Sequence, residues 1–367
     1  MHDRELFEKA FSPLHASPDT LTEVRKTMRN EKKTRRALGK SAVVAIAAAL
    51  TLTVAVASGI VTLIKADVSP ADKVDDATHR AFTDDIDAAA PVVDDGKGGL
   101  VPVPDMERIP GDVQTTQRLV GQYLSKLDAE MTVDSNTIKL GTFLIDENGL
   151  GLLTYSVENP DGVKYTDAGY GEAVDMSAEP SMWLGSAPDA QGYGGTCINS
   201  RCHVDEDAST DTHLQVVLYF AAGKDFQKGD DFYFTVCDSA RQPYSISIQP
   251  QTYVPVKTLT AKNGEIVTLS ALGMTIVNPD PSREIHTDEV LVNAKDGSSF
   301  AVESSSKNLM NWVIGSITGD GQAAFENYTY VFNRLVDVNE VGSVTLTGYY
   351  YNLDGSDNDT VSLTYQP

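Results

Sequence analysis

The cysteines are the residues whose type and spacing come nearest to a chemical site. The chain has three of them, Cys197, Cys202 and Cys237, and His203 directly follows the second. Four such ligands could bind zinc, but this spacing matches no common zinc pattern. An oxidising compartment also allows a local disulfide between Cys197 and Cys202. We therefore favour that disulfide, or buried thiols, over a metal site.

No pattern for catalysis is present in the sequence. The histidines of the region after residue 65 lie outside any HExxH motif, and the chain has no nucleophile elbow and no phosphate-binding loop. Acidic turns at residues 205–207 and 354–359 could bind calcium, but they lack EF-hand spacing and are expected to be solvated. We predict that the protein is not an enzyme and that it holds no metal or cofactor.

Aromatic residues near the carboxyl terminus could instead contact a ligand. Tyr349, Tyr350 and Tyr351 are consecutive, and Trp312 precedes them by 37 positions. Such rings could form a carbohydrate platform. Because alternate residues of a strand face opposite sides, at least one tyrosine is expected to belong to the core.

One long apolar run precedes the strands and turns that position these residues. Residues 41–64 are uncharged and lie between Lys40 and Lys65, a length sufficient to cross a hydrocarbon core of about 30 Å. This predicts a transmembrane helix over residues 41–65. The alternative is a cleaved signal peptide, since Ala55-Val56-Ala57 resembles a cleavage site.

The charges predict the orientation of this span. Residues 1–65 carry 11 Lys and Arg against 6 Asp and Glu, a net charge of +5. Because the whole chain has a net charge of −23, residues 66–367 carry −28. Basic residues crowd the flank before the span, so the amino terminus is expected in the cytoplasm and the acidic part outside. An acidic region of this size is a poor partner for nucleic acid.

Residues 1–40 are predicted to form short amphipathic helices in the cytoplasm. Capping signals stand at Asp3 and at Ser17-Pro18-Asp19. Two such helices bury little surface by themselves, so their apolar face needs either the inner leaflet or a partner protein. The residues expected to bind a partner are Leu6, Phe7, Phe11, Leu14, Leu21 and Val24.

The run from Phe11 to Val24, followed by a basic segment and an Ala/Val-rich span, resembles the start of single-pass membrane proteins of Gram-positive bacteria. Those proteins resemble membrane-anchored anti-sigma factors, and their outer parts carry β-sandwich domains of unknown function. The stretch from Phe332 to Asn352 also resembles the closing strands of such a domain. The resemblance implies an extracytoplasmic-function sigma factor as the cytoplasmic partner. It implies no zinc, since no cysteine accompanies His2 or His15.

The outer region is predicted to be mainly β. Residues 66–111 are rich in Ala, Asp and Pro and are expected to form an acidic stalk. Residues 113–131 are predicted to form a helix capped by Asp112. Short apolar segments separated by turn residues then predict strands, which we list by range: 137–145, 150–157, 214–220, 231–237, 244–248, 256–261, 266–277 broken at Gly273, 290–293, 300–303, 312–317, 328–332, 343–351 and 360–365.

The strand spacing is typical of two immunoglobulin-like β-sandwich domains. The first would cover residues 112–255, with a long insertion at 160–212, and the second residues 256–367. The sequence as a whole predicts a membrane-anchored regulator, with a region outside the cell that senses or assembles and a cytoplasmic segment that sequesters a sigma factor. The alternative is a cell-surface binding or adhesion module held by the same span.

Overall fold

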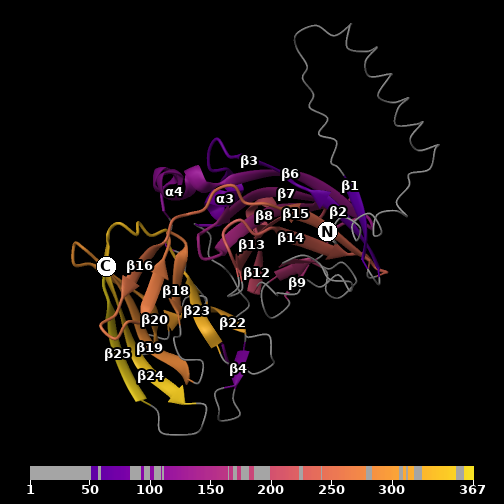
Figure 1. The fold of residues 1–367 in the computed structure, drawn as a ribbon. Helices are drawn as coiled ribbons and strands as arrows, with labels where there is room; N and C mark the ends of the chain where they lie inside the picture. Colours follow the sequence, from indigo (N-terminus) through magenta and orange to yellow (C-terminus); the bar gives the residue numbers. More distant parts are fainter. Residues whose placement is uncertain are drawn as a thin grey trace, which may run out of the picture. The chain divides into compact units, whose positions relative to one another are not determined.

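The computed structural model describes most of the chain after residue 50. The described residues are 51–56, 59–82, 92–94, 100–102, 109, 111–163, 165–167, 172–174, 182–185, 199–222, 226–240, 242–277, 283–305, 309–310, 313–317, 325–352 and 359–367. The six residues expected to bind a cytoplasmic partner, together with Cys197 and Trp312, lie outside this set. The described part of the chain is mainly β, as predicted, and its strands lie in one compact unit (Figure 1). We call the parts built around its two main apolar cores the first and the second domain.

The first domain consists of two sheets. The larger has the order β12 (Asn199–Val204), β13 (His213–Ala221), β8 (Leu150–Glu158), β7 (Asn136–Ile145), β6 (Ser125–Val133) and β3 (Asp67–Pro70). The smaller has the order β1 (Thr51–Val56), β2 (Gly59–Lys65), β15 (Pro243–Ile248), β14 (Phe232–Cys237) and β11 (Met182–Gly185). Neighbouring strands are antiparallel, except that β2 pairs with β15 in parallel.

The core of the first domain lies between these sheets. Phe143 of β7 and Phe220 of β13 both contact Phe232 of β14, with ring centroids 5.5 and 5.6 Å apart. Tyr155 of β8 packs on Phe234 at 5.0 Å. Because burying one such ring contributes about 1.5–3 kcal/mol, these contacts hold the two sheets face to face.

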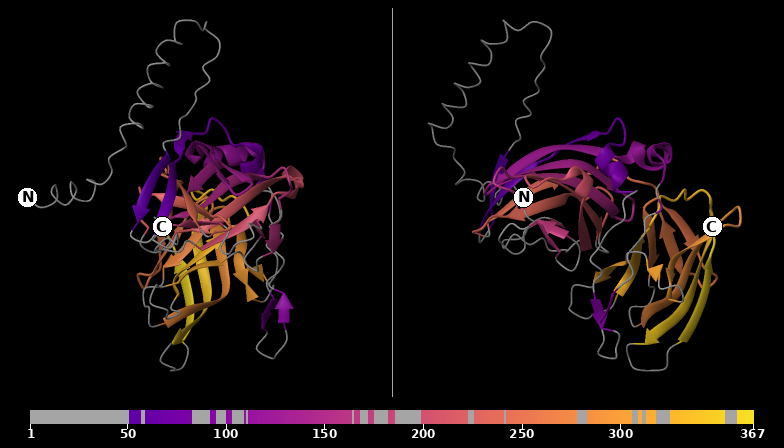
Figure 2. Two further views of the ribbon diagram at one scale, coloured as in Figure 1. Left: turned by 90° about the vertical axis from the view of Figure 1, so that its right-hand side faces the viewer. Right: turned by 180° about the vertical axis from the view of Figure 1, so that it is seen from behind.

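Short elements lie outside these sheets. In the first domain they are α3 (Asp76–Arg80), α4 (Val113–Val120), the 3-10 turn η1 (Gly121–Tyr123), β9 (Tyr165–Asp167), β10 (Glu172–Val174) and the 3-10 turn η2 (Glu206–Ala208). Strands β4 (Val92–Asp94) and β5 (Leu100–Pro102) pair with each other in a separate two-stranded sheet. Figure 2 shows the long purple and magenta strands of the larger sheet running side by side, as the pairing of β6, β7 and β8 requires.

The second domain also has two antiparallel sheets. The first has the order β16 (Lys257–Thr260), β17 (Ile266–Leu269), β18 (Gly273–Val277), β23 (Phe325–Val331) and β22 (Val313–Ile317). The second has the order β21 (Leu309–Met310), β20 (Ser299–Ser304), β19 (Arg283–Ala294), β24 (Val341–Asn352) and β25 (Asp359–Tyr365). One apolar core includes side chains of both sheets, such as Ile276 of β18 and Leu346 of β24. The predicted strand 266–277 is broken as expected, but at residues 270–272, and Gly273 begins β18.

A third apolar cluster contains residues of both domains. Leu150 and Leu152 of β8 belong to it together with Leu272 and Val331 of the second domain. At the same junction, the Asn148 side-chain amide donates to the hydroxyl oxygen of Thr268 at 2.6 Å. The two domains are therefore joined by packing as well as by the chain.

Three segments differ from the expectations. The helix over residues 113–131 ends at Val120, and β6 follows. Residues 125–133 alternate strictly between buried and exposed, which is the period of a strand. Leu127 and Met131 therefore reach the core from one face of a sheet rather than from a helix.

The described part of the predicted transmembrane helix is a β-hairpin. Strands β1 and β2 occupy residues 51–56 and 59–65, which are rich in the β-branched residues Thr, Val and Ile. Ile64 is 9% exposed within the first core, and the Ala66 N–H donates to the Ser247 carbonyl at 2.9 Å. No helix among the residues the structure describes has the length and apolarity to cross a bilayer.

Part of the predicted stalk is folded as well. Strand β3 pairs with β6, and the Asp75 carboxylate caps α3 by accepting from the Thr78 N–H at 2.7 Å. Phe82 is 5% exposed. Residues 66–82 therefore belong to the first domain, because their few apolar side chains are buried against it.

Candidate functional site

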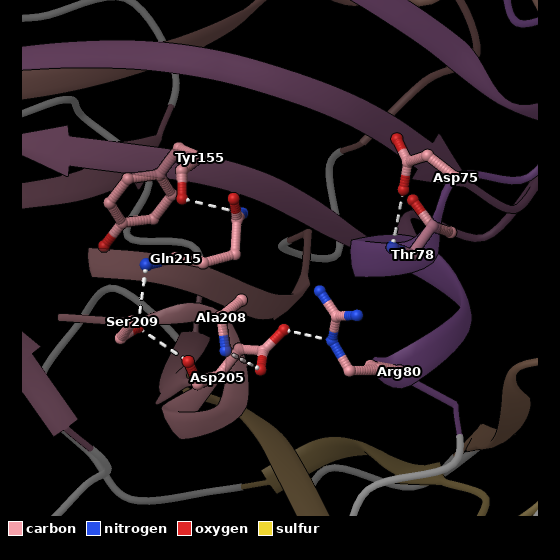
Figure 3. A network of polar contacts seen from close by, with 8 residues as sticks. All are labelled: Asp75, Thr78, Arg80, Tyr155, Asp205, Ala208, Ser209 and Gln215. Carbon is pink, nitrogen blue, oxygen red and sulfur yellow. Dashed lines mark hydrogen bonds and ion pairs between the residues drawn. The ribbon is translucent and has the colours of Figure 1, made fainter. Parts of the chain in front are cut away.

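A polar network of the first domain joins α3 to η2 and β13 (Figure 3). Arg80 Nε lies 2.5 Å from Oδ2 of Asp205, a carboxylate that is 2% exposed. The other oxygen, Oδ1, accepts from the Ala208 N–H at 3.0 Å. Ser209 Oγ donates to the Asp205 carbonyl and accepts from the Gln215 N–H. Both carboxylate oxygens thus have partners, and the network holds α3 in place.

A second buried carboxylate lies in the β7–β8 turn. Asp146 Oδ1 accepts from the N–H groups of Asn148 and Leu150, each at 2.9 Å. Complete burial raises the pKa of Asp146 to about 6, while hydrogen bonds from Ser270 and from these backbone groups oppose the shift. Asp146 also forms a β-bridge with Val254. Its contacts join the turn to the residues that lead into the second domain.

Two glutamates of the second domain bind tyrosines. Glu303 Oε2 accepts from the Tyr330 hydroxyl at 2.7 Å, and burial raises the pKa of Tyr330 well above its ordinary value. Glu265 accepts from the hydroxyls of Tyr350 and Tyr365. These pairs satisfy phenol groups at the edges of a core, and the structure gives them no evident chemical role.

The cysteine site remains a prediction. Cys202 Sγ lies 3.7 Å from the hydroxyl of Tyr155, and Cys237 is 4% exposed. The proposed partner of Cys202, Cys197, is outside the described residues. Within the described ranges, no three His, Cys, Asp or Glu side chains are grouped so that they could hold a metal ion.

The outer surface of β24 and β25 differs from all of these networks. Antiparallel register pairs Thr345 with Thr364, Thr347 with Ser362 and Tyr349 with Thr360. Alternate residues of β24, among them Val344, Leu346 and Tyr350, are buried, so the paired residues face outward. On each strand, residues two positions apart, which face the same side, are about 7 Å apart. We call these six residues the hydroxyl ladder.

Next to the hydroxyl ladder, β19 contributes a second aromatic ring. His286 pairs with Tyr349 in the sheet, and their rings stack with centroids 5.0 Å apart and an angle of 6° between them. On the other side of Tyr349, Thr360 of β25 is its partner in the sheet. Tyr350 is 9% exposed and belongs to the core, as the alternation predicted.

The acidic members of this surface come from the same strand. Thr287 pairs with Gly348 and Glu289 with Thr347, so Asp288 forms a bulge between them. Asp288 is exposed and Glu289 partly exposed. None of the six residues of the ladder carries a charge. The surface therefore combines hydroxyl groups, an aromatic pair and hydrogen-bond acceptors, and it has no Lys or Arg at the positions named here.

Sequence reasoning identified only part of this site. It singled out Tyr349 but not His286, because the two residues are 63 positions apart and only the register of β19 with β24 brings them together. The side chains of Tyr351 and Trp312 are not among those described. No model of a known protein family matches this chain, and a search of curated proteins finds no significant match.

Proposed function

We propose that this protein is a membrane-anchored recognition protein that binds a ligand outside the cell through the outer surface of β19, β24 and β25. The observation that carries the proposal is the hydroxyl ladder beside the stacked rings of His286 and Tyr349. Convergent polar groups around an aromatic ring provide both contact area and orientation for a ligand. This is a binding function rather than a catalytic one.

An immunoglobulin-like fold of the second domain forms part of the proposal. In variable-type immunoglobulin domains, one sheet has the order A-B-E-D and the other C″-C′-C-F-G. Here β17, β18, β22 and β23 would be A, B, D and E. Strands β19, β20, β21, β24 and β25 would be C, C′, C″, F and G, with β16 as an additional edge strand. Both sheet orders support this assignment, although a shared fold by itself does not define a ligand.

The proposed anchor has to be reconciled with strand β2. An anchor of residues 41–58, roughly 27 Å long as a helix, requires that β1 (Thr51–Val56) leave its pairing with β2 in the membrane-bound protein, while residues 59–65 stay paired with β15. The length of this anchor is close to the hydrocarbon thickness of about 30 Å. We propose a cytoplasmic amino terminus, a span that ends near Ser58, and a first domain that begins directly after it.

The membrane topology can be measured in intact cells. External protease should degrade the described domains and leave a membrane-bound fragment that contains residues 1–40. Recovery of a soluble protein that starts at Ser58 would instead support the signal-peptide alternative and contradict the anchor.

A second candidate function, regulation of a sigma factor, is favoured by the amphipathic pattern of residues 1–24 and by the resemblance described above. Rings such as those of Phe7 and Phe11 would be anchors in a groove, whereas a lipid surface requires only apolar character. Replacing both by Leu should weaken a specific complex by about 1–3 kcal/mol and leave membrane affinity nearly unchanged.

Calorimetry of full-length protein with the sigma factor encoded nearest its gene, together with reporter transcription, tests this candidate. Binding that is insensitive to the two substitutions, or no binding, would remove the sigma-factor function. The recognition proposal does not depend on that result.

Recognition itself can be tested with a photo-crosslinking amino acid in the full chain on intact cells. Placed at Thr347, within the ladder, it should give a specific adduct. Placed at Thr258, an exposed threonine of β16 on the other sheet, it should give none. Equal labelling at the two positions would contradict a binding role for this surface.

A further inference from the structure

We infer that the ligand of this surface is a neutral polysaccharide, an inference that rests on the proposed recognition function. The first argument is the regular arrangement of the hydroxyl groups. Three cross-strand pairs, each with a hydroxyl on both strands, follow one another along β24 and β25. A chain of sugar units carries hydroxyl groups along its whole length, so successive units can hydrogen-bond to successive pairs.

The second argument is that these hydroxyl groups are available. Thr347, Thr360, Ser362 and Thr364 are exposed. A hydroxyl group both donates and accepts, so such a row can hydrogen-bond to the hydroxyl groups of a sugar in either direction.

The third argument is the aromatic pair. The His286 ring stacks on Tyr349, and Tyr349 is itself a member of the ladder, paired with Thr360 of β25. The axial C–H groups of a pyranose ring form an apolar patch that packs on an aromatic face. The ladder and the ring would thus bind the polar edge and the apolar face of the same ligand.

The acidic charge of the protein favours a neutral polymer over an anionic one as the ligand. The chain has a net charge of −23, and Asp288 and Glu289 lie beside Thr347. A polyanion would be repelled. Carboxylates accept hydrogen bonds but do not donate them when ionised, which suits the hydroxyl donors of a sugar. The same net charge opposes the pairing of this surface with a second copy of the chain.

The test uses full-length protein in detergent micelles and affinity electrophoresis in gels that contain dextran, hydroxyethylcellulose, arabinoxylan or galactomannan. At least one of these neutral polysaccharides should retard the protein. Tyr349→Ala and Thr347→Asp should each weaken binding about tenfold or more, since each removes or charges a central contact. The matched control Thr258→Asp, which adds the same charge to the other sheet, should bind like wild type.

Two cellulose derivatives test the charge argument on one backbone. Carboxymethylcellulose, which is anionic, should bind more weakly than hydroxyethylcellulose. A quaternary-ammonium cellulose, which is cationic, should bind more tightly than hydroxyethylcellulose only at low salt, and this difference should disappear at high salt. Failure of all four neutral polymers, or equal losses in Thr258→Asp and Thr347→Asp, would overturn the inference. A specific photo-adduct at Thr347 alongside such a failure would show that recognition stands and that the ligand class is wrong.

Discussion

At the scale of single residues, two buried aspartates that the structure describes in the first domain differ in how their charge is compensated. Asp205 has a cationic partner in Arg80, whereas Asp146 is surrounded by backbone N–H groups and the Ser270 hydroxyl. An ionised carboxylate without a cation in a buried position depends on those dipoles alone. Each site therefore predicts a different response to mutation and to pH.

Asp146 predicts a dependence of stability on pH. Its pKa in the folded protein, about 6, is above the ordinary value of 3.8, so folding favours the protonated form. The associated stabilisation is complete below about pH 4 and is lost as the pH rises through 6. A shift of this size corresponds to about 3 kcal/mol.

Asp146→Asn tests this prediction, because asparagine keeps the shape and the acceptor oxygen but does not titrate. Relative to the variant, wild type should lose free energy of unfolding between pH 4 and pH 7, as measured by denaturant titration at both values. Parallel pH profiles of the two proteins would show that the hydrogen bonds keep Asp146 ionised throughout.

Replacing Arg80 should lower the free energy of unfolding, because its partner Asp205 is buried. Arg80→Met leaves the Asp205 carboxylate buried without its cation and should lower the free energy of unfolding by about 1–3 kcal/mol. The matched control is Lys139→Met. Lys139 lies 3.6 Å from Glu130 in a pair whose side chains are 46% and 54% exposed, and such pairs contribute less than about 1 kcal/mol. Equal losses in thermal or chemical unfolding would contradict the assigned role of Arg80.

At the scale of elements, the sequence was informative wherever local pattern and local contact coincide. The hairpin of β7 and β8 was predicted from the residues 146–149 turn, in which Gly149 has φ of 90° and a Cβ would lie 2.5 Å from that of Ala222. Strands β17 and β18 were predicted in the same way. These elements depend on residues close in sequence.

Two segments whose strand pairing involves distant partners were predicted as helices instead. The run at residues 41–65 has the composition of a membrane helix, and its strand pairing depends on β15, about 180 positions later. Residues 125–131 fit a helical pattern through Leu124, Leu127 and Met131, but β3 and β7 supply strand partners on both sides. In each case tertiary pairing overrides a local preference.

The alternation of buried and exposed side chains in strand β2 provides a testable prediction. Ile64 is 9% exposed in the core, and Lys65 is exposed on the opposite face. Ile64→Asp should therefore lower the free energy of unfolding by about 2–4 kcal/mol, and Lys65→Asp by less than about 0.5 kcal/mol. Tryptophan fluorescence in a denaturant titration measures both. If neither substitution changes the unfolding of the domains, residues 59–65 are not part of the sheet.

At the scale of the whole molecule, the shared apolar cluster predicts that the two domains unfold together. Leu272 is 6% exposed and lies in that cluster with Leu150 and Leu152. Leu272→Asp should weaken the junction, so that calorimetry shows two separated transitions in place of one. The control Thr364→Asp, at an exposed position of β25, should keep a single transition. Separate transitions already in wild type would show that the junction does not couple the domains.

The parallel pairing of β2 with β15 also determines how the molecule would respond to mechanical tension. Residues 62–65 run in the same direction as residues 244–247. In the anchored arrangement proposed above, with the span ending near Ser58, tension from the membrane would pull β2 toward its amino-terminal end. A ligand held by the second domain would pull β15 toward its carboxyl-terminal end, since the chain continues from there to β16. The two strands would be loaded in opposite directions along their axes, so their hydrogen bonds would share the force and break together rather than one by one.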